Sequence, residues 1–177
     1  TAAAKIDADV HILVAGNDCS AVAESSAEYD GVSKVLLADK PSHEHHLPES
    51  LGPLVIELAT NYTAILLAAS TTGKNLAPRV AALLDVAQIS DIVAVEAADT
   101  FVRPVYAGNA LATVQSNDSI KIITVRTSAF DETASGNTKA PIEYVDFALE
   151  QDSSRFVSEN LAVSERPELA AASIVIS

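Results

Sequence analysis

Residues 63–92, with the sequence TAILLAASTTGKNLAPRVAALLDVAQISDI, decide the fold that we predict. The apolar run 64–69 is typical of a strand that is covered on both faces. Polar residues 70–73 interrupt this run, a helical pattern follows, and residues 91–95 return to a strand pattern. Because such crossovers are nearly always right-handed, we expect two parallel strands joined by a helix.

Pro78 limits where the predicted helix begins, because proline is tolerated in the first helical turn and is costly deeper in a helix. This reasoning places Asn75 at the N-cap, Leu76 at the first helical position and Pro78 at the third. The apolar side chains that share one helical face are Leu76, Val80, Leu83, Leu84 and Ala87.

The loop formed by residues 70–74 follows the carboxyl end of a predicted parallel strand, where ligands of open α/β sheets tend to bind. Gly73 and Lys74 invite comparison with a phosphate-binding loop. That motif also requires glycine where this chain has Ala68, and serine or threonine where it has Asn75. We therefore favour a loop that packs or meets a partner, with phosphate binding as the minor alternative.

The chain before this unit repeats the same alternation of strands and helices. We predict strands at 10–15 and 34–38 and helices at 21–29 and 49–59. This pattern indicates a three-layer α/β fold of the Rossmann-like type, with a mainly parallel sheet and helices on both faces.

After residue 97 the pattern changes to short strands separated by turn residues. We predict a hairpin of strands 101–107 and 110–115 around Gly108 and Asn109, and a third strand at 119–127. Together they form an antiparallel meander, in which Pro104 makes the first strand an edge or bulged strand. We also expect strands at 142–149 and 171–177 and an extended segment at 155–163.

The composition excludes several classes of function. The chain has 177 residues, 49% of them hydrophobic, and a net charge of -13. This acidity argues against nucleic-acid binding and against anionic membrane surfaces. No apolar run approaches the ~20 residues of a membrane span, and a single cysteine, Cys19, excludes an internal disulfide framework.

The candidate catalytic and metal-binding residues are few. His43, His45 and His46 cluster in a predicted surface loop, where a metal site is the minor alternative. His11 is expected to be a hydrogen-bonded or edge histidine within the first strand. Cys19 lies near a helix N-terminus, a position that can lower the pKa of a thiol. We assign no catalytic residue and no metal ligand.

Arg79, Arg103 and Arg126 stand out in a chain that has only 11 lysines and arginines. Each of the three flanks an apolar stretch. They are candidates for contacts with a partner protein, although structural ion pairs within the chain are the favoured interpretation.

Three segments carry a resemblance to one family: residues 71–92, residues 100–114 (TFVRPVYAGNALATV) and residues 120–130 (IKIITVRTSAF). Residues 155–177 also fit. The chain resembles the N-terminal domain of the electron transfer flavoprotein alpha subunit, and the resemblance covers nearly all of it.

The resemblance implies an electron carrier, not an enzyme. Proteins of this family are heterodimers of alpha and beta subunits in the bacterial cytoplasm or mitochondrial matrix. They accept electrons from flavin dehydrogenases, such as acyl-CoA dehydrogenases in fatty acid β-oxidation, and pass them to a quinone oxidoreductase. Their single FAD is held mainly by a C-terminal domain of the alpha subunit.

The same resemblance implies that residues 1–177 are one domain, in which about 165–177 lead into an FAD-binding domain after Ser177. We therefore expect no FAD or AMP on this chain alone. Its expected role is a scaffold that packs against the beta subunit, partly through residues 101–115. The alternatives are a free-standing adenine-nucleotide-binding module and, with less support, a small hydrolase.

Overall fold

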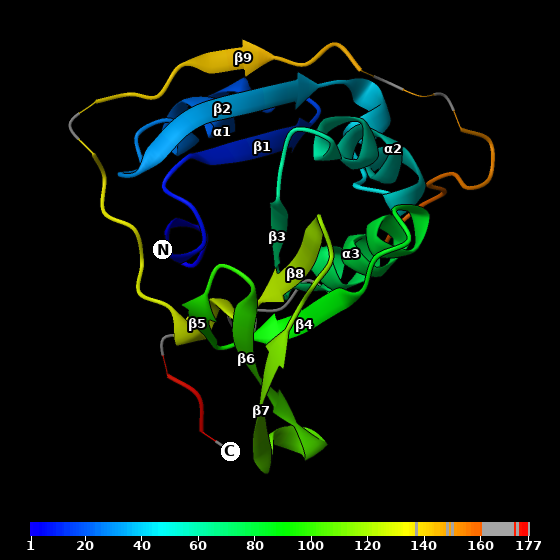
Figure 1. Cartoon of the computed structure of the whole chain (residues 1–177). Helices are drawn as coiled ribbons and strands as arrows, with labels where there is room; N and C mark the ends of the chain where they lie inside the picture. Colours follow the sequence, from blue (N-terminus) through cyan, green and yellow to red (C-terminus); the bar gives the residue numbers. More distant parts are fainter. Residues whose placement is uncertain (137, 148, 150, 161–171, 173, 177) are drawn as a thin grey trace.

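The computed structural model describes residues 1–136, 138–147, 149, 151–160, 172 and 174–176 (Figure 1). Its α-helices are α1 (Ser20–Ser26), α2 (Pro48–Ala59) and α3 (Thr71–Leu83). The strands before α3 are β1 (Val10–Gly16), β2 (Val32–Asp39) and β3 (Ala64–Ala68). Those after it are β4 (Gln88–Ile92), β5 (Ala94–Ala97), β6 (Thr100–Val105), β7 (Ala110–Gln115), β8 (Lys121–Val125) and β9 (Ile142–Tyr144). Short 3-10 helices are η1 (Ala3–Lys5), η2 (Pro41–His43), η3 (Tyr106–Gly108) and η4 (Thr127–Ala129).

The fold class is α/β, with mainly parallel strands and one antiparallel sheet, as the sequence predicts. Parallel strands form two sheets, with the orders β1-β2-β9 and β3-β8-β4. Strands β5, β6 and β7 form the antiparallel sheet. Helix α1 packs on β2, whereas α2 and α3 pack on each other and α3 lies on β8 (Figure 1).

The two parallel sheets share a hydrophobic core, although their strands do not pair with each other. Leu54 of α2, Val80 of α3 and Ile122 of β8 are fully buried in this core. Strands β1 and β3 are each the edge of a sheet. As a result, β3 is only half-buried, which corrects the prediction that its apolar run is covered on both faces.

Strand β8 is the main correction to the predicted topology. We predicted residues 119–127 as the third strand of the meander, but β8 lies between β3 and β4 and is parallel to both. Ile122, Ile123 and Thr124 are all buried there, which suits the centre of a parallel sheet. The third strand of the antiparallel sheet is β5.

Helix α3 begins earlier than we predicted. Its N-cap is Ser70, whose hydroxyl accepts a hydrogen bond of 3.2 Å from the Gly73 amide. Pro78 therefore lies inside the helix, and its missing N–H removes one hydrogen bond of the helical ladder. Burial of Leu76 and Val80 against the core offsets this loss, whereas Leu83 is 56% exposed at the end of the helix.

The predicted hairpin is confirmed as β6 and β7, with Phe101 opposite Val114 and Val105 opposite Ala110. Strand β6 is the central strand, and not the edge that Pro104 suggested. Proline is tolerated because β5 pairs only with residues from Thr100 to Val102, so Pro104 has a ladder partner on one side alone.

The last segments contain less regular structure than we predicted. The strand predicted at 142–149 is limited to β9, which pairs with β2. Residues 155–160 form no strand, and the rest of the predicted extended segment lies outside the described residues, as does most of 171–177. No helix in the described part of the chain is both long and apolar enough to cross a membrane.

Candidate functional site

A cluster of charged side chains lies where β3, β4 and β8 end. The guanidinium of Arg126 donates two hydrogen bonds to the carboxylate of Asp91, one of them 3.2 Å long. The Nε of Arg103 donates to the backbone oxygen of Ser90 at 2.9 Å. Two of the three candidate arginines therefore contact adjacent residues of β4.

Asp91 is the centre of this cluster. Its backbone adopts a φ of 60°, in the left-handed region, and its amide donates to the Thr124 hydroxyl at 2.8 Å. Hydrogen bonds from Arg126 lower the pKa of the Asp91 carboxyl, and the charges of Lys74 and Arg103 act in the same direction. This carboxylate is therefore held in its ionised form.

A polar cavity of about 360 Å³ opens beside this carboxylate. It is lined by Ala68, Ala69, Ser70, Lys74, Asp91, Arg126, Thr127 and Ser128. Within the described part of the chain, Lys74 has no ion-pair partner. Two cations, three hydroxyl-bearing side chains and one carboxylate suit polar binding contacts.

Gly73 lies in the first turn of α3, beside this cavity, where the helix approaches the end of β3. A Cβ atom at this position would lie 1.9 Å from the backbone oxygen of Ala68. The glycine is therefore required for close packing of α3 against the end of β3. Its amide donates to the Ser70 hydroxyl as part of the helix N-cap, so the glycine has a structural role.

Arg79 lies apart from this cluster, on α3. Its guanidinium pairs with the Glu49 carboxylate at 3.3 Å, and Glu49 also accepts a hydrogen bond of 3.0 Å from the Ser154 hydroxyl. Arg79 and Arg126 thus make the ion pairs within the chain that the sequence interpretation favoured, whereas Arg103 donates a hydrogen bond to a backbone oxygen. Their role in binding a partner stays a prediction.

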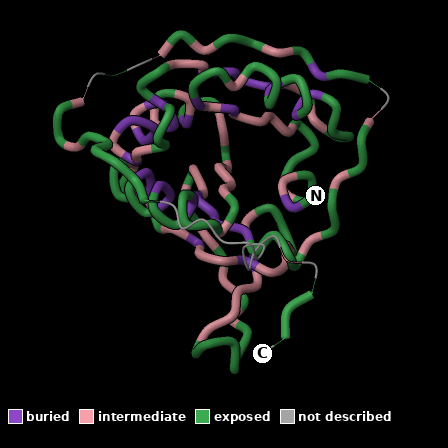
Figure 2. Tube along the Cα trace, turned by 180° about the vertical axis from the view of Figure 1, so that it is seen from behind, coloured by how far each residue is buried: buried purple, intermediate pink, exposed green. Residues whose placement is uncertain are grey.

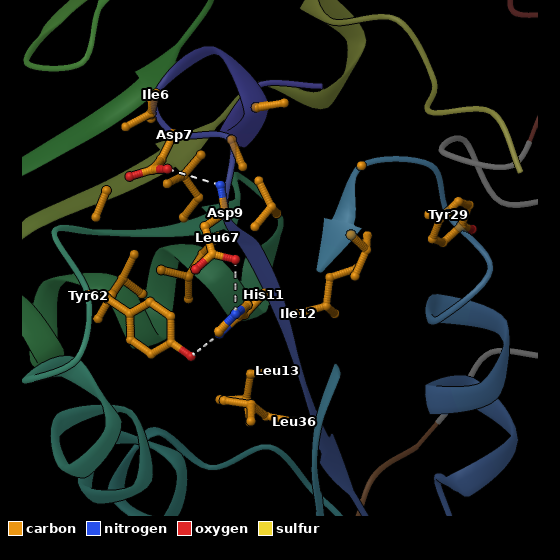
Figure 3. Close-up of a pocket in the computed structure, with 18 of the residues that line it drawn as sticks. Ile6, Asp7, Asp9, His11, Ile12, Leu13, Tyr29, Leu36, Tyr62 and Leu67 are labelled. Carbon is orange, nitrogen blue, oxygen red and sulfur yellow. Dashed lines mark hydrogen bonds and ion pairs between the residues drawn. The ribbon is translucent and has the colours of Figure 1, made fainter. Parts of the chain in front are cut away.

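A larger cleft, of about 970 Å³, separates the edges of β1 and β3 (Figure 3). The Tyr62 hydroxyl and His11 Nδ1 are 2.7 Å apart across this cleft, and His11 Nε2 lies 3.3 Å from Asp9. This confirms His11 as a hydrogen-bonded histidine. Burial raises the pKa of the Tyr62 phenol. The sequence did not identify Tyr62 as a partner of His11, because the two residues are 51 positions apart.

The histidine-rich loop is exposed at His45 and His46, as predicted, but His43 is buried. His43 is only 1% exposed and interacts with the Ser50 hydroxyl at 3.3 Å. Because Ser50 donates its own proton to the Ser42 oxygen, His43 Nδ1 must be the donor. His45 stacks on Phe156 with ring centroids 3.6 Å apart. Among the described residues, no three metal-ligating side chains converge.

Cys19 does not have the lowered thiol pKa that a position near a helix N-terminus can produce. Although it precedes α1, burial raises the pKa of its thiol, and the Asp39 carboxylate nearby raises it further. Asp39 accepts a hydrogen bond of 3.2 Å from the Cys19 amide. The local charge therefore opposes thiolate formation.

Comparison with known proteins gives one family. The family model described as "Electron transfer flavoprotein domain" matches residues 1–150. "Electron transfer flavoprotein subunit alpha" of Pseudomonas aeruginosa is 54% identical over 176 residues, which are 99% of this chain and 57% of that protein. The protein of the same name in Bradyrhizobium diazoefficiens is 50% identical over all of this chain and 56% of its own length.

A eukaryotic relative is more distant. "Electron transfer flavoprotein subunit alpha, mitochondrial" of Dictyostelium discoideum is 42% identical over 193 residues, covering all of this chain and 54% of that protein. The chain thus spans little more than half the length of the curated relatives it matches.

Proposed function

Because the chain belongs to the electron transfer flavoprotein family, we propose that it is the N-terminal α/β domain of an alpha subunit and acts as a scaffold. It packs against a beta subunit and supports a flavin domain formed by other residues. The observation that carries the proposal is 54% identity to an alpha subunit over 99% of this chain.

In the complete protein, the complex is a heterodimer and a carrier of electrons. It accepts electrons from flavin dehydrogenases and delivers them to a quinone oxidoreductase in the bacterial cytoplasm or mitochondrial matrix. FAD supplies the redox chemistry, and the protein orients the flavin and tunes its surroundings. Residues 165–177 lead from the scaffold toward the flavin domain.

The described residues of this chain do not fit the pyrophosphate of FAD. A dinucleotide fold needs glycines that let the backbone approach the phosphates. At Gly73 the space that a phosphate would need is occupied by the backbone oxygen of Ala68. At Gly16 an added Cβ would lie 3.3 Å from the Cys19 side chain. We therefore place the FAD contacts outside this chain, which also disfavours an adenine-nucleotide-binding module.

Arg79, Arg103 and Arg126 remain our candidates for the surface that contacts the beta subunit. Arg103 has the clearest test because it lies within the β6–β7 hairpin, paired with Ala112. Arg103→Glu should weaken the heterodimer, measured by sedimentation velocity of the full-length subunits. Lys139→Glu is the matched control, because Lys139 pairs with Glu28 in another part of the fold.

The function itself is tested by co-expression of the full-length alpha subunit with the beta subunit encoded in the same genome. We expect a one-to-one complex on sedimentation. A full-length alpha subunit that stays folded but forms no complex with that beta subunit would contradict the proposed function.

A further inference from the structure

The β6–β7 hairpin projects beyond the rest of the antiparallel sheet. Strand β5 ends its pairing with β6 at Val102, whereas β7 pairs with β6 as far as Val105. Within the described part of the chain, no third strand pairs with the far half of the hairpin. Figures 1 and 2 show this half extending away from the body of the molecule, with mostly exposed residues at its end.

The end of this hairpin presents large apolar side chains to solvent. Tyr106 is 83% exposed and Leu111 is 68% exposed. Pro104 pairs directly with Leu111 and so lies on the same face of the hairpin. We call Pro104, Tyr106 and Leu111 the hairpin tip. Apolar side chains that gather in one exposed place are typical of a surface that contacts another protein.

The backbone at the hairpin tip is held in an unusual conformation. Tyr106 has a φ of 51°, Ala107 a φ of 55° and Gly108 a φ of 90°. The left-handed region is unfavourable for tyrosine and alanine, and such residues cluster at ligand clamps and binding sites. The turn thus fixes the direction of the Tyr106 side chain at a cost in backbone energy.

The charge of the hairpin indicates what covers it. Residues 100–115 contain Arg103 and no acidic residue, although the whole chain has 24 aspartates and glutamates. A second copy of the chain would bring another net charge of -13 to the contact, and like charges oppose such an approach. A different protein with an apolar pocket is the better occupant.

We propose that the hairpin tip anchors the beta subunit, with the Tyr106 ring inserted into an apolar pocket of that subunit. This inference rests on the proposed function and specifies the surface through which it works. Exposed aromatic side chains that become buried at the centre of an interface are typical binding hot spots. Tyrosine also loses little conformational freedom when it is buried.

Tyr106→Ala tests the hairpin tip in the full-length heterodimer. Alanine keeps the Cβ atom, so the backbone cost of the positive φ is unchanged. The matched control is Tyr144→Ala, because Tyr144 is 75% exposed and lies on β9, at the opposite end of the molecule from the hairpin (Figure 1). We expect the dissociation constant to rise more than about tenfold for Tyr106→Ala and less than about twofold for the control. Tyr106→Phe should retain binding.

The outcomes separate this inference from the proposed function. If the wild-type subunits form no complex, the proposed function fails. If they form a complex and the two alanine variants bind equally, only the hairpin tip is refuted. Two other results also refute the hairpin tip, because the tip would then be covered by another surface. In one, Tyr106→Ala still binds the beta subunit but loses FAD; in the other, the substitution breaks a dimer of alpha subunits.

Discussion

Gly73→Ala tests the packing of α3 on β3, because the substitution has two opposing effects on stability. Helix propensity alone predicts that alanine stabilises the helix by about 1 kcal/mol. The new Cβ, however, would lie 1.9 Å from the Ala68 oxygen, and real Cβ atoms essentially never come closer than 3.0 Å to a neighbour. Either β3 or α3 must therefore move by about 1 Å.

The steric effect should be the larger one. Overpacking of a well-packed core typically costs 1–3 kcal/mol and occasionally more, and here the obstacle is backbone that cannot rotate away. Taking the upper end of that range, about 3 kcal/mol, and subtracting about 1 kcal/mol for helix propensity, we expect Gly73→Ala to lower the free energy of unfolding by roughly 2 kcal/mol. Urea unfolding followed by circular dichroism measures this change.

Gly52→Ala is the matched control, because Gly52 is also helical and buried. Its added Cβ would meet only the Arg79 side chain, at 3.6 Å, which is an ordinary contact. We expect this variant to be neutral or stabilised by up to about 1 kcal/mol. Equal effects of the two substitutions, or a Gly73→Ala protein more stable than wild type, would refute the packing argument.

Three further predictions concern the core, the buried His43 and the Asp91–Arg126 ion pair. Phe101→Ala, at a fully buried position, should cost about 3–5 kcal/mol in thermal unfolding, and a loss below 1 kcal/mol would contradict the packing. Burial lowers the pKa of His43 from its ordinary 6.5, so on acidification the unfolded chain binds the proton first. The free energy of unfolding should therefore fall as the pH drops from 6.5 through the folded-state pKa, and His43→Leu should flatten that slope. Hydrogen bonds from Arg126 lower the pKa of Asp91 below 3.8, so the stability that this ion pair contributes is present above pH 3.8 and is lost on further acidification. Denaturant titrations would disprove this if the free energy of unfolding of Asp91→Asn fell with acidification as steeply as that of wild type.

The central crossover was predictable because its signals are local. An apolar run, a polar break and a helical period specify strand, loop and helix wherever they occur. The hairpin at Gly108 was predictable for the same reason. In contrast, β8 was assigned to the wrong sheet, because its sequence does not encode which strands lie beside it.

The details of the charged cluster required long-range information. Asp91 and Arg126 are separated by 35 residues, and no spacing rule connects them. His43 is buried because η2 packs against β1 and α2, so its polar neighbours in the sequence were misleading. Ser70 was overlooked as the N-cap because Pro78 seemed to exclude an early start, yet buried Val80 and Leu76 compensate for the lost hydrogen bond.

The central claim is that this chain is the scaffold of a flavoprotein and that other residues hold the flavin. Visible absorbance of the purified full-length alpha–beta complex, beside that of residues 1–177 alone, tests it most directly. The account predicts a flavin spectrum for the complex and none for residues 1–177. A stoichiometric flavin spectrum from residues 1–177 alone would contradict it.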